Sequence, residues 1–243
     1  MSTRLVALHG FTMNGAGLRH MLAELERRLA GVVELTCPDA PHVASQDSVA
    51  GLASFMGGFR AKPPNLEWWN ASDDRRTYRG WQASRDAVRA EMERALLAEG
   101  RLAEGTRLGL LGFSQGAAMA AVLAALSERG AFPRLSFVVL VAGFLPRADD
   151  LEPLFEPAIR VPSLHVWGDA DRFAKHSPGL LERFSPDTRQ VLRWPGPHAV
   201  PSQGSEGDVL VEFVRRHASG EPPLLATASG RAGASGCRER DGE

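Results

Sequence analysis

The sequence is poor in cysteine and has no excess of either charge. Cys37 and Cys237 are the only cysteines among 243 residues, too few for a disulfide framework. Lys and Arg number 28 and Asp and Glu 29, so the formal net charge is −1. This balance argues against the basic surface that binds nucleic acid or an anionic membrane. With 44% hydrophobic residues the chain can bury one sizeable core, and we expect a domain that folds without disulfides or metal in a reducing cytoplasm.

A long apolar leader is also lacking, because the first residues pass directly into a short strand-like run at residues 5–8. One uncharged stretch, residues 108–126, reaches the length of a membrane span. Gly, Ser and Gln interrupt it, and its pattern is that of a strand followed by a helix. We therefore expect this stretch to be buried in a core, and we expect no membrane span.

Residues 108–118 read L-G-L-L-G-F-S-Q-G-A-A and combine a buried-strand pattern with the start of an Ala-rich helix. Between the two lies Gly-x-Ser-x-Gly, with Ser114 at its centre. In such a tight turn the flanking glycines remove Cβ atoms that would clash, so the serine can adopt a strained backbone with an exposed hydroxyl. The pattern alone is weak, but in this strand–helix context it predicts a nucleophilic serine.

Short apolar runs alternate with helical periodicity along the chain. Strand-like runs cover residues 5–8, 32–36, 108–111, 136–141, 161–167 and 190–194. Helical patterns cover residues 18–29, 81–97, 117–126 and 209–214. This alternation predicts an α/β domain over residues 1–219, with about six mostly parallel strands flanked by helices. Residues 220–243 consist largely of Gly, Ala, Ser, Pro and charged residues, which predicts a disordered tail.

Side chains suited to acyl transfer follow the carboxyl ends of these runs, where parallel sheets bind ligands. A serine hydroxyl needs an imidazole to take its proton and a carboxylate to orient that imidazole. His198 lies in a Gly/Pro loop after the last strand and is the preferred base among seven histidines. Asp171 is the preferred acid, with Asp169 as its competitor in the same loop. The order Ser114, Asp171, His198 is that of the α/β hydrolases.

Two loops are expected to provide backbone donors to a tetrahedral oxyanion. The first is His9-Gly10-Phe11, after the first strand, where Phe11, or failing that Thr12, gives an N–H group. The second donor is the N–H of Gln115, the residue after the nucleophile. His9 itself is interpreted as a packing residue that fixes this loop.

Residues 37–80 lack clean periodicity and are rich in aromatic side chains. A segment of this length inside a compact domain is normally functional or disordered, and tryptophans argue against disorder. We interpret it as a lid or substrate wall inserted after the second strand; in the alternative interpretation, Trp68 and Trp69 only anchor the loop on the core. The residues expected to contact substrate are Thr12, Trp68, Trp69, Tyr78, Phe144 and Ala199.

Several of these segments together resemble the serine hydrolase (FSH) family of the α/β-hydrolase superfamily. They are H-G-F at residues 9–11, C-P-D-A-P-H at 37–42, W-W at 68–69, Y-x-G-x-x-x-S at 78–84, G-F-S-Q-G at 112–116, P-S-L-H-V-W-G-D-A-D at 162–171 and G-P-H at 196–198. The resemblance spans about residues 3–217. It implies carboxylesterase or thioesterase activity without metal or cofactor, with Ser114 as nucleophile, Asp171 as acid and His198 as base. Pro197 and Ala199 depart from the family's usual residues, beside the expected pocket wall.

Two other functions fit parts of the pattern. An acyl-protein thioesterase or phospholipase-type carboxylesterase shares G-F-S-Q-G but lacks the long insertion. A non-catalytic ligand-binding protein on the same fold is disfavoured because all three expected catalytic residues are present. The expected partner is a small-molecule ester or thioester, and the expected assembly is a monomer or homodimer. The acyl chain and the natural substrate are not encoded in any motif.

Overall fold

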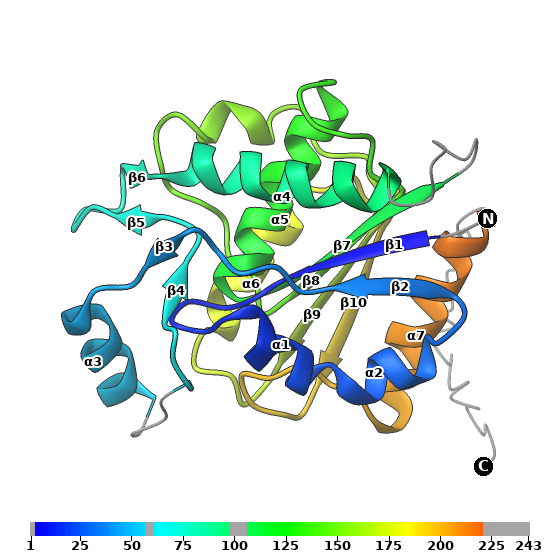
Figure 1. Ribbon diagram of the computed structural model, residues 1–243, viewed down its shortest axis with the longest axis horizontal. Helices are drawn as coiled ribbons and strands as arrows, with labels where there is room; N and C mark the ends of the chain where they lie inside the picture. Colours follow the sequence, from blue (N-terminus) through cyan, green and yellow to red (C-terminus); the bar gives the residue numbers. More distant parts are fainter. Residues whose placement is uncertain (1–2, 57–60, 98–105, 221–243) are drawn as a thin grey trace, which may run out of the picture.

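The computed structural model describes residues 3–56, 61–97 and 106–220. For residues 95–97 it describes the backbone and not the side chains. Its centre is one sheet of six parallel strands in the order β10-β9-β8-β7-β1-β2 (Figure 1). The strands are β1 (Thr3–Leu8), β2 (Val33–Thr36), β7 (Arg107–Phe113), β8 (Phe137–Val141), β9 (Ser163–Gly168) and β10 (Arg189–Trp194). The expected parallel sheet is confirmed. Of the expected tail, only Gly220 lies within the described residues.

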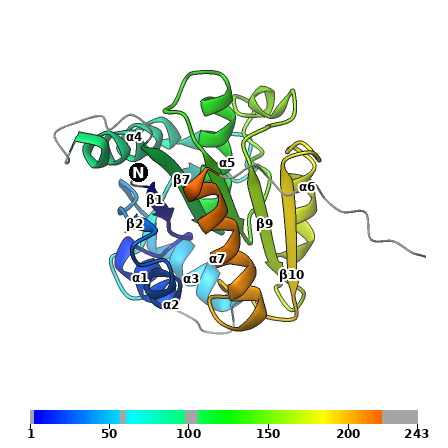
Figure 2. The same ribbon diagram turned by 90° about the vertical axis from the view of Figure 1, so that its right-hand side faces the viewer.

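Helices cover both faces of the sheet (Figures 1 and 2). One face carries α4 (Trp81–Leu97), α5 (Gln115–Glu128) and α6 (Ser177–Leu181). The other carries α1 (Gly15–Met21), α2 (Ala23–Arg28) and α7 (Gly204–Ser219). The single helix expected over residues 18–29 is two helices that meet at Leu22.

The alternation of side chains along each strand divides the core into two clusters. Val6 and Leu8 of β1 and Leu110 of β7 pack toward α4 and α5. Leu5 of β1 and Leu111 of β7 pack toward the opposite helices. Because successive side chains of a strand point to opposite faces, a doubly covered sheet needs apolar residues at every position. The continuous apolar runs in the sequence have this cause.

The uncharged stretch 108–126 forms the centre of this core. It is divided at Ser114 between β7 and α5, and all α5 residues from Gln115 to Leu126 are buried. Burial on every side explains why α5 has no polar face. Over residues 3–56, 61–97 and 106–220, no helix has the length and apolar character needed to cross a membrane.

The strand order reverses next to β1, which lies between β7 and β2. After β2 the chain returns past β1, and the later strands β7, β8, β9 and β10 follow in that order on the other side of β1. In such a sheet the crevice beyond the carboxyl ends of the strands at the reversal is the usual ligand position. Residues 9–12 follow β1 and Ser114 follows β7, so the fold brings both expected loops to the same edge of the sheet.

The insertion after β2 lies at one end of the sheet (Figure 1). It contains α3 (Gln46–Phe55) and two small antiparallel pairs. The pairs are β3 (His42–Val43) with β4 (Leu66–Glu67), and β5 (Asn70–Ala71) with β6 (Tyr78–Arg79). Residues 37–80 thus contain regular elements that their lack of clean periodicity did not indicate. Ser45 caps α3 by accepting a hydrogen bond from the Ser48 N–H at 3.1 Å. The helix buries only Ala53, so its sequence has weak apolar periodicity.

Candidate active site

Ser114 has a backbone conformation that non-glycine residues rarely adopt, with φ 54° and ψ −116°. Three hydrogen bonds hold this conformation in place. The Ser114 N–H donates to the Val141 carbonyl at 2.9 Å, and the Ser114 carbonyl accepts from Ala117 at 3.0 Å and Ala118 at 3.1 Å. Strain of this kind persists only where the surrounding structure over-determines it, and it concentrates at functional sites. The serine side chain is half-buried at the start of α5.

The two glycines of the Gly-x-Ser-x-Gly motif lie where a side chain would not fit. A Cβ atom at Gly112 would lie 2.4 Å from the carbonyl oxygen of Gly116. A Cβ atom at Gly116 would lie 2.1 Å from the carbonyl oxygen of Leu8, the last residue of β1. Backbone atoms cannot move aside for such a contact, so the close packing of α5 on β1 and β7 depends on glycine at both positions.

Asp171 and His198 form a buried pair. The Nδ1 atom of His198 lies 2.8 Å from Oδ2 of Asp171, and the carboxylate side chain is 0% exposed. The other oxygen, Oδ1, accepts a hydrogen bond from the Phe173 N–H at 2.7 Å. The carboxylate is thus fixed from both sides. An imidazole held in this way keeps Nδ1 protonated and presents Nε2 as the free acceptor.

Asp169, the competitor for the acid position, has a different environment. Its side chain is 49% exposed and lies 2.7 Å from the Arg193 guanidinium on the edge strand β10. Exposed ion pairs of this kind contribute little to stability. The geometry therefore places Asp171, and not Asp169, against His198.

Aromatic rings surround the His198 imidazole. The Phe113 ring centroid lies 4.8 Å from that of His198, and Phe113 is the residue before Ser114. On another side, the Phe173 ring lies 5.1 Å away. Among the described residues the Ser114 hydroxyl forms no hydrogen bond, and the His198 ring packs on the ring of Phe113, the residue before the serine. Catalytic hydrogen bonds often tighten only when substrate is bound.

Two backbone N–H groups near Ser114 in the fold have no acceptor among the described residues. Gln115 is the first residue of α5, so its N–H has no acceptor in a preceding helical turn. In the other loop, Thr12 donates its N–H to the Leu66 carbonyl at 2.9 Å, whereas no described group accepts from the Phe11 N–H. Of the two donors considered for this loop, Phe11 is therefore the available one.

His9 is fully buried and acts as a bridge between two loops. Its Nε2 atom accepts a hydrogen bond from the Ala40 N–H at 3.0 Å, so Nδ1 carries the proton and donates to the Gly10 carbonyl at 2.9 Å. Burial lowers the pKa of this imidazole, which favours the neutral form that the two bonds require. The arrangement fits the structural role expected for His9.

Gln115 also holds the insertion with its side chain. Its Oε1 atom accepts from the Trp68 N–H at 3.0 Å, and its Nε2 atom donates to the Trp69 carbonyl at 3.2 Å. The Trp68 indole donates to the His9 carbonyl at 2.8 Å, and Ser84 donates to the Trp68 carbonyl at 2.6 Å. The residue after the serine thus ties the insertion to the serine turn.

The aromatic residues expected to face substrate are mostly buried. Trp68 is 0% exposed, and the Trp69 and Tyr78 rings stack on each other with centroids 4.7 Å apart. The Tyr78 hydroxyl accepts from the Arg147 N–H at 3.1 Å. These contacts fit the alternative interpretation, in which the aromatic residues anchor the insertion. Thr12 is buried, while Phe144 and Ala199 are half-buried.

The sequence analysis did not identify a contact between the insertion and the residues that follow Asp171. The Phe55 ring at the end of α3 lies 5.2 Å from the Phe173 ring. The Arg172 side chain donates to the Phe55 carbonyl at 2.5 Å and lies over the Phe55 ring. The position of Phe173 two residues after Asp171 is the only sequence signal that could have indicated its contacts with Phe55 and His198.

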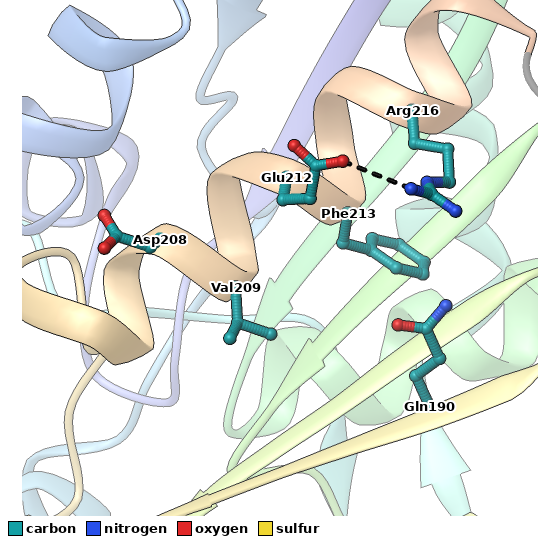
Figure 3. A pocket seen from close by; sticks show the side chains of 6 residues that line it. All are labelled: Gln190, Asp208, Val209, Glu212, Phe213 and Arg216. Atoms are coloured by element: carbon teal, nitrogen blue, oxygen red, sulfur yellow. Dashed lines mark hydrogen bonds and ion pairs between the residues drawn. The ribbon is translucent and has the colours of Figure 1, made fainter. Parts of the chain in front are cut away.

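Two surface hollows lie away from Ser114, Asp171 and His198. One, of about 290 Å³, is lined by side chains of α7 and β10 such as Val209, Phe213 and Gln190 (Figure 3). The other, of about 460 Å³, lies on the insertion and includes His42 and Glu67. Burial raises the pKa of the Glu67 carboxyl, to which Asn70 donates at 3.4 Å. Neither hollow includes the serine, the acid or the histidine described above.

Comparison with known proteins places the chain in a family. The model of the serine hydrolase (FSH1) family matches residues 1–209. Esterase AAEL000016 of Aedes aegypti is 33% identical over 217 residues, which cover 87% of this chain and 75% of the relative. Esterase OVCA2 is 33% identical in Danio rerio over 230 residues and 29% identical in Homo sapiens over 221, each covering 88% of this chain and 96% of the relative.

Solved structures show the same fold. Acyl-protein thioesterase 2 of Zea mays has a TM-score of 0.61 at 24% identity, covering 89% of this chain and 94% of its own. A carboxylesterase from Mesorhizobium loti has a TM-score of 0.59 at 18% identity, with 87% of both chains covered. The strained serine turn, the sheet order and these matches agree, and the chain belongs to the serine hydrolase (FSH1) family, whose members are hydrolases with the α/β-hydrolase fold.

Proposed function

We propose that this hydrolase cleaves carboxylic esters or thioesters through an acyl-enzyme on Ser114. The observation that carries the proposal is the buried hydrogen bond between Asp171 and His198, with the imidazole packed on the ring of Phe113 directly before the strained serine. A nucleophile, a base and an orienting carboxylate are the three groups that acyl transfer to a serine requires.

In the first step the Ser114 oxygen attacks the carbonyl carbon while His198 Nε2 takes the hydroxyl proton. The Asp171 carboxylate stabilises the imidazolium that forms and keeps its orientation. The C–O or C–S bond to the leaving group then breaks, and His198 returns the proton to the leaving alcohol or thiol. In the second step water repeats the attack on the acyl-enzyme, which releases the acid and restores the serine.

The N–H groups of Phe11 and Gln115 are the proposed donors to the oxyanion. Neither N–H group has an acceptor among the described residues. Preorganised donors stabilise the charge that develops on the oxygen, by about 3 kcal/mol for each donor removed by mutation in other enzymes. Tying the Trp68 and Trp69 backbone to Gln115 keeps this donor rigid.

The proposed substrate is a small molecule with an apolar part near the scissile bond. Half-buried or exposed phenylalanines from four segments, Phe11, Phe55, Phe144 and Phe173, provide apolar surface around the crevice. Apolar pockets with a few fixed polar groups are typical of small-molecule sites. The residues of this wall set the acyl chain length.

Pre-steady-state hydrolysis tests the proposal. With p-nitrophenyl esters and acyl thioesters of increasing chain length, we expect a burst of one product per active site followed by slower turnover. Ser114→Ala is expected to remove both the burst and the turnover. Binding of the ester without any release of p-nitrophenol would instead support a non-catalytic protein.

A further inference from the structure

The loop that carries the Phe11 N–H group turns at a strained residue. The Met13 N–H donates to the Gly10 carbonyl at 3.1 Å, which closes a four-residue turn over residues 10–13. The third residue of this turn is Thr12, which has φ 62°. Turns with positive φ at this position favour glycine or asparagine, and a β-branched side chain rarely adopts such a conformation. Other groups must therefore hold Thr12 in place.

This turn sets the direction of the Phe11 N–H group. That N–H belongs to the peptide unit whose carbonyl is the carbonyl of Gly10. The Gly10 carbonyl accepts from His9 Nδ1 at 2.9 Å as well as from the Met13 N–H. In a trans peptide unit the N–H and the carbonyl point in opposite directions. The direction of the Phe11 N–H thus depends on the Met13 bond, and that bond forms only when the chain turns at Thr12.

The insertion supplies the groups that hold the turn. Leu66 of β4 accepts from the Thr12 N–H at 2.9 Å and donates to the Met13 carbonyl at 2.9 Å, which makes an antiparallel bridge. The Asn65 side chain donates to the Thr12 carbonyl at 2.7 Å. Its contact with the Ala61 carbonyl is longer, at 3.5 Å. Because both neighbours are carbonyl oxygens, the amide nitrogen of Asn65 is the atom that faces them.

We propose that Asn65 is a positioning residue for acyl transfer, which holds the turn at Thr12 so that the Phe11 N–H is directed at the oxyanion. This inference rests on the proposed function and adds a residue that no motif of the sequence indicated. Asn65 acts through the Thr12 carbonyl and does not touch the substrate. Without its hydrogen bond the strained turn can relax, and the N–H group then leaves the position that the transition state requires.

A second asparagine bonds the same part of the insertion without bonding this turn. The Asn14 side chain donates to the Lys62 carbonyl at 2.8 Å and to the Pro64 carbonyl at 2.9 Å. It also accepts from the Gly17 N–H at the start of α1. Asn14 therefore joins α1 to the insertion, whereas Asn65 joins the turn itself to the insertion. The two asparagines allow anchoring to be separated from positioning.

The test combines acylation kinetics with a matched pair of ketones. The burst of p-nitrophenol counts the active sites and gives the acylation rate constant for each site. Octyl trifluoromethyl ketone is expected to add to the Ser114 hydroxyl as a tetrahedral hemiketal that needs oxyanion donors, whereas octyl methyl ketone binds without addition. The ratio of the two inhibition constants therefore reports on the oxyanion donors alone.

Two substitutions remove the donor of Asn65. Asn65→Ala removes the amide, and Asn65→Asp keeps its size but, when ionised, has no donor. Each is expected to lower the acylation rate constant per site about tenfold to hundredfold. The inhibition constant of the trifluoromethyl ketone should rise by a similar factor. The inhibition constant of the methyl ketone, and the ester concentration that gives half of the maximal burst rate, should stay within about twofold of the wild type.

Asn14→Ala is the matched control, expected to lower the free energy of unfolding but to leave the acylation rate per site and the ketone ratio unchanged. Asn65 variants that behave in the same way would overturn the inference, because Asn65 would then only anchor the insertion. Weaker binding of the ester and of the methyl ketone, with an unchanged ketone ratio, would also overturn it. A burst that survives Ser114→Ala would instead overturn the proposed function.

Discussion

Asp171 holds His198 from a position that solvent does not reach. Its Oδ2 atom lies 2.8 Å from Nδ1 of the imidazole, and its side chain is 0% exposed. Asp169, two residues earlier, faces outward to Arg193 and is 49% exposed. One short loop thus gives two carboxylates opposite environments, and only one of them can orient the proposed base.

Replacing each carboxylate by its amide separates these environments. Asp171→Asn is expected to lower kcat by about 10³- to 10⁴-fold, because the amide favours the wrong imidazole tautomer. Asp169→Asn removes only an exposed ion pair, and we expect kcat within about twofold of the wild type. Steady-state hydrolysis of a p-nitrophenyl ester measures both. Equal losses in the two variants would contradict the assignment of the acid.

Gln115→Ala tests the bond between the nucleophile turn and the insertion. The substitution leaves the buried Trp68 N–H and Trp69 carbonyl without their partner. An unsatisfied buried group costs about 1–3 kcal/mol, so the free energy of unfolding in urea should fall by at least that amount. The control is Gln82→Ala on the exposed side of α4, expected within about 0.5 kcal/mol of the wild type. Similar values for both variants would show that the hydrogen bonds of the Gln115 side chain to Trp68 and Trp69 do not stabilise the protein.

The Phe55–Phe173–His198 contacts predict that the insertion supports the base. Phe173→Ala removes a ring 5.1 Å from the imidazole and is expected to lower kcat more than it changes KM. An aromatic pair contributes about 0.5–1.5 kcal/mol, which corresponds to roughly a two- to tenfold loss of rate.

The loss in Phe173→Ala should disappear in a His198→Ala background, because two residues that act through one another are not additive. Phe55→Ala is expected to have a smaller effect in the same direction. Val43→Ala, which changes a side chain that is 77% exposed on the same insertion, serves as control and should leave kcat unchanged. An undiminished loss from Phe173→Ala without His198 would show that the ring does not act through the base.

Acid should destabilise the protein through its buried histidines. Burial lowers the pKa of His9, of His217 and of His165, the last to about 3. The unfolded chain binds protons below about pH 6.5 that the folded chain does not, so the stability from these groups is complete above pH 6.5 and is lost as pH falls toward the folded-state pKa values. Urea unfolding at pH 7.5 and 5 measures the loss. His165→Gln should reduce this dependence, whereas replacing the exposed His20 by Gln should not.

The sheet and the strained turn at Ser114 were predictable because their signals are local. A strand buried on both faces must be apolar at every position, and the turn needs glycine where a Cβ would meet backbone, as at Gly116. Helix α3 was missed because Ser48, Gly51 and Ser54 are poor helix formers and the helix buries only Ala53.

The roles of the aromatic side chains could not be read from the sequence. A tryptophan that anchors a loop and one that lines a pocket have the same composition, and only the hydrogen bonds of Trp68 distinguish them. The choice between Phe11 and Thr12 likewise depends on a long-range bond to Leu66. The contact of Phe55 with Phe173 joins residues 118 positions apart, which no local pattern encodes.

Covalent labelling with a fluorophosphonate probe tests the role of Ser114 most directly. We predict that intact-mass analysis of the wild-type protein finds one adduct per chain, and that peptide mapping locates it on the peptide containing Ser114. His198→Ala should label much more slowly, and Ser114→Ala should carry no adduct. Equal labelling of Ser114→Ala and the wild type would contradict the account, because the reactive hydroxyl would then lie elsewhere in the chain.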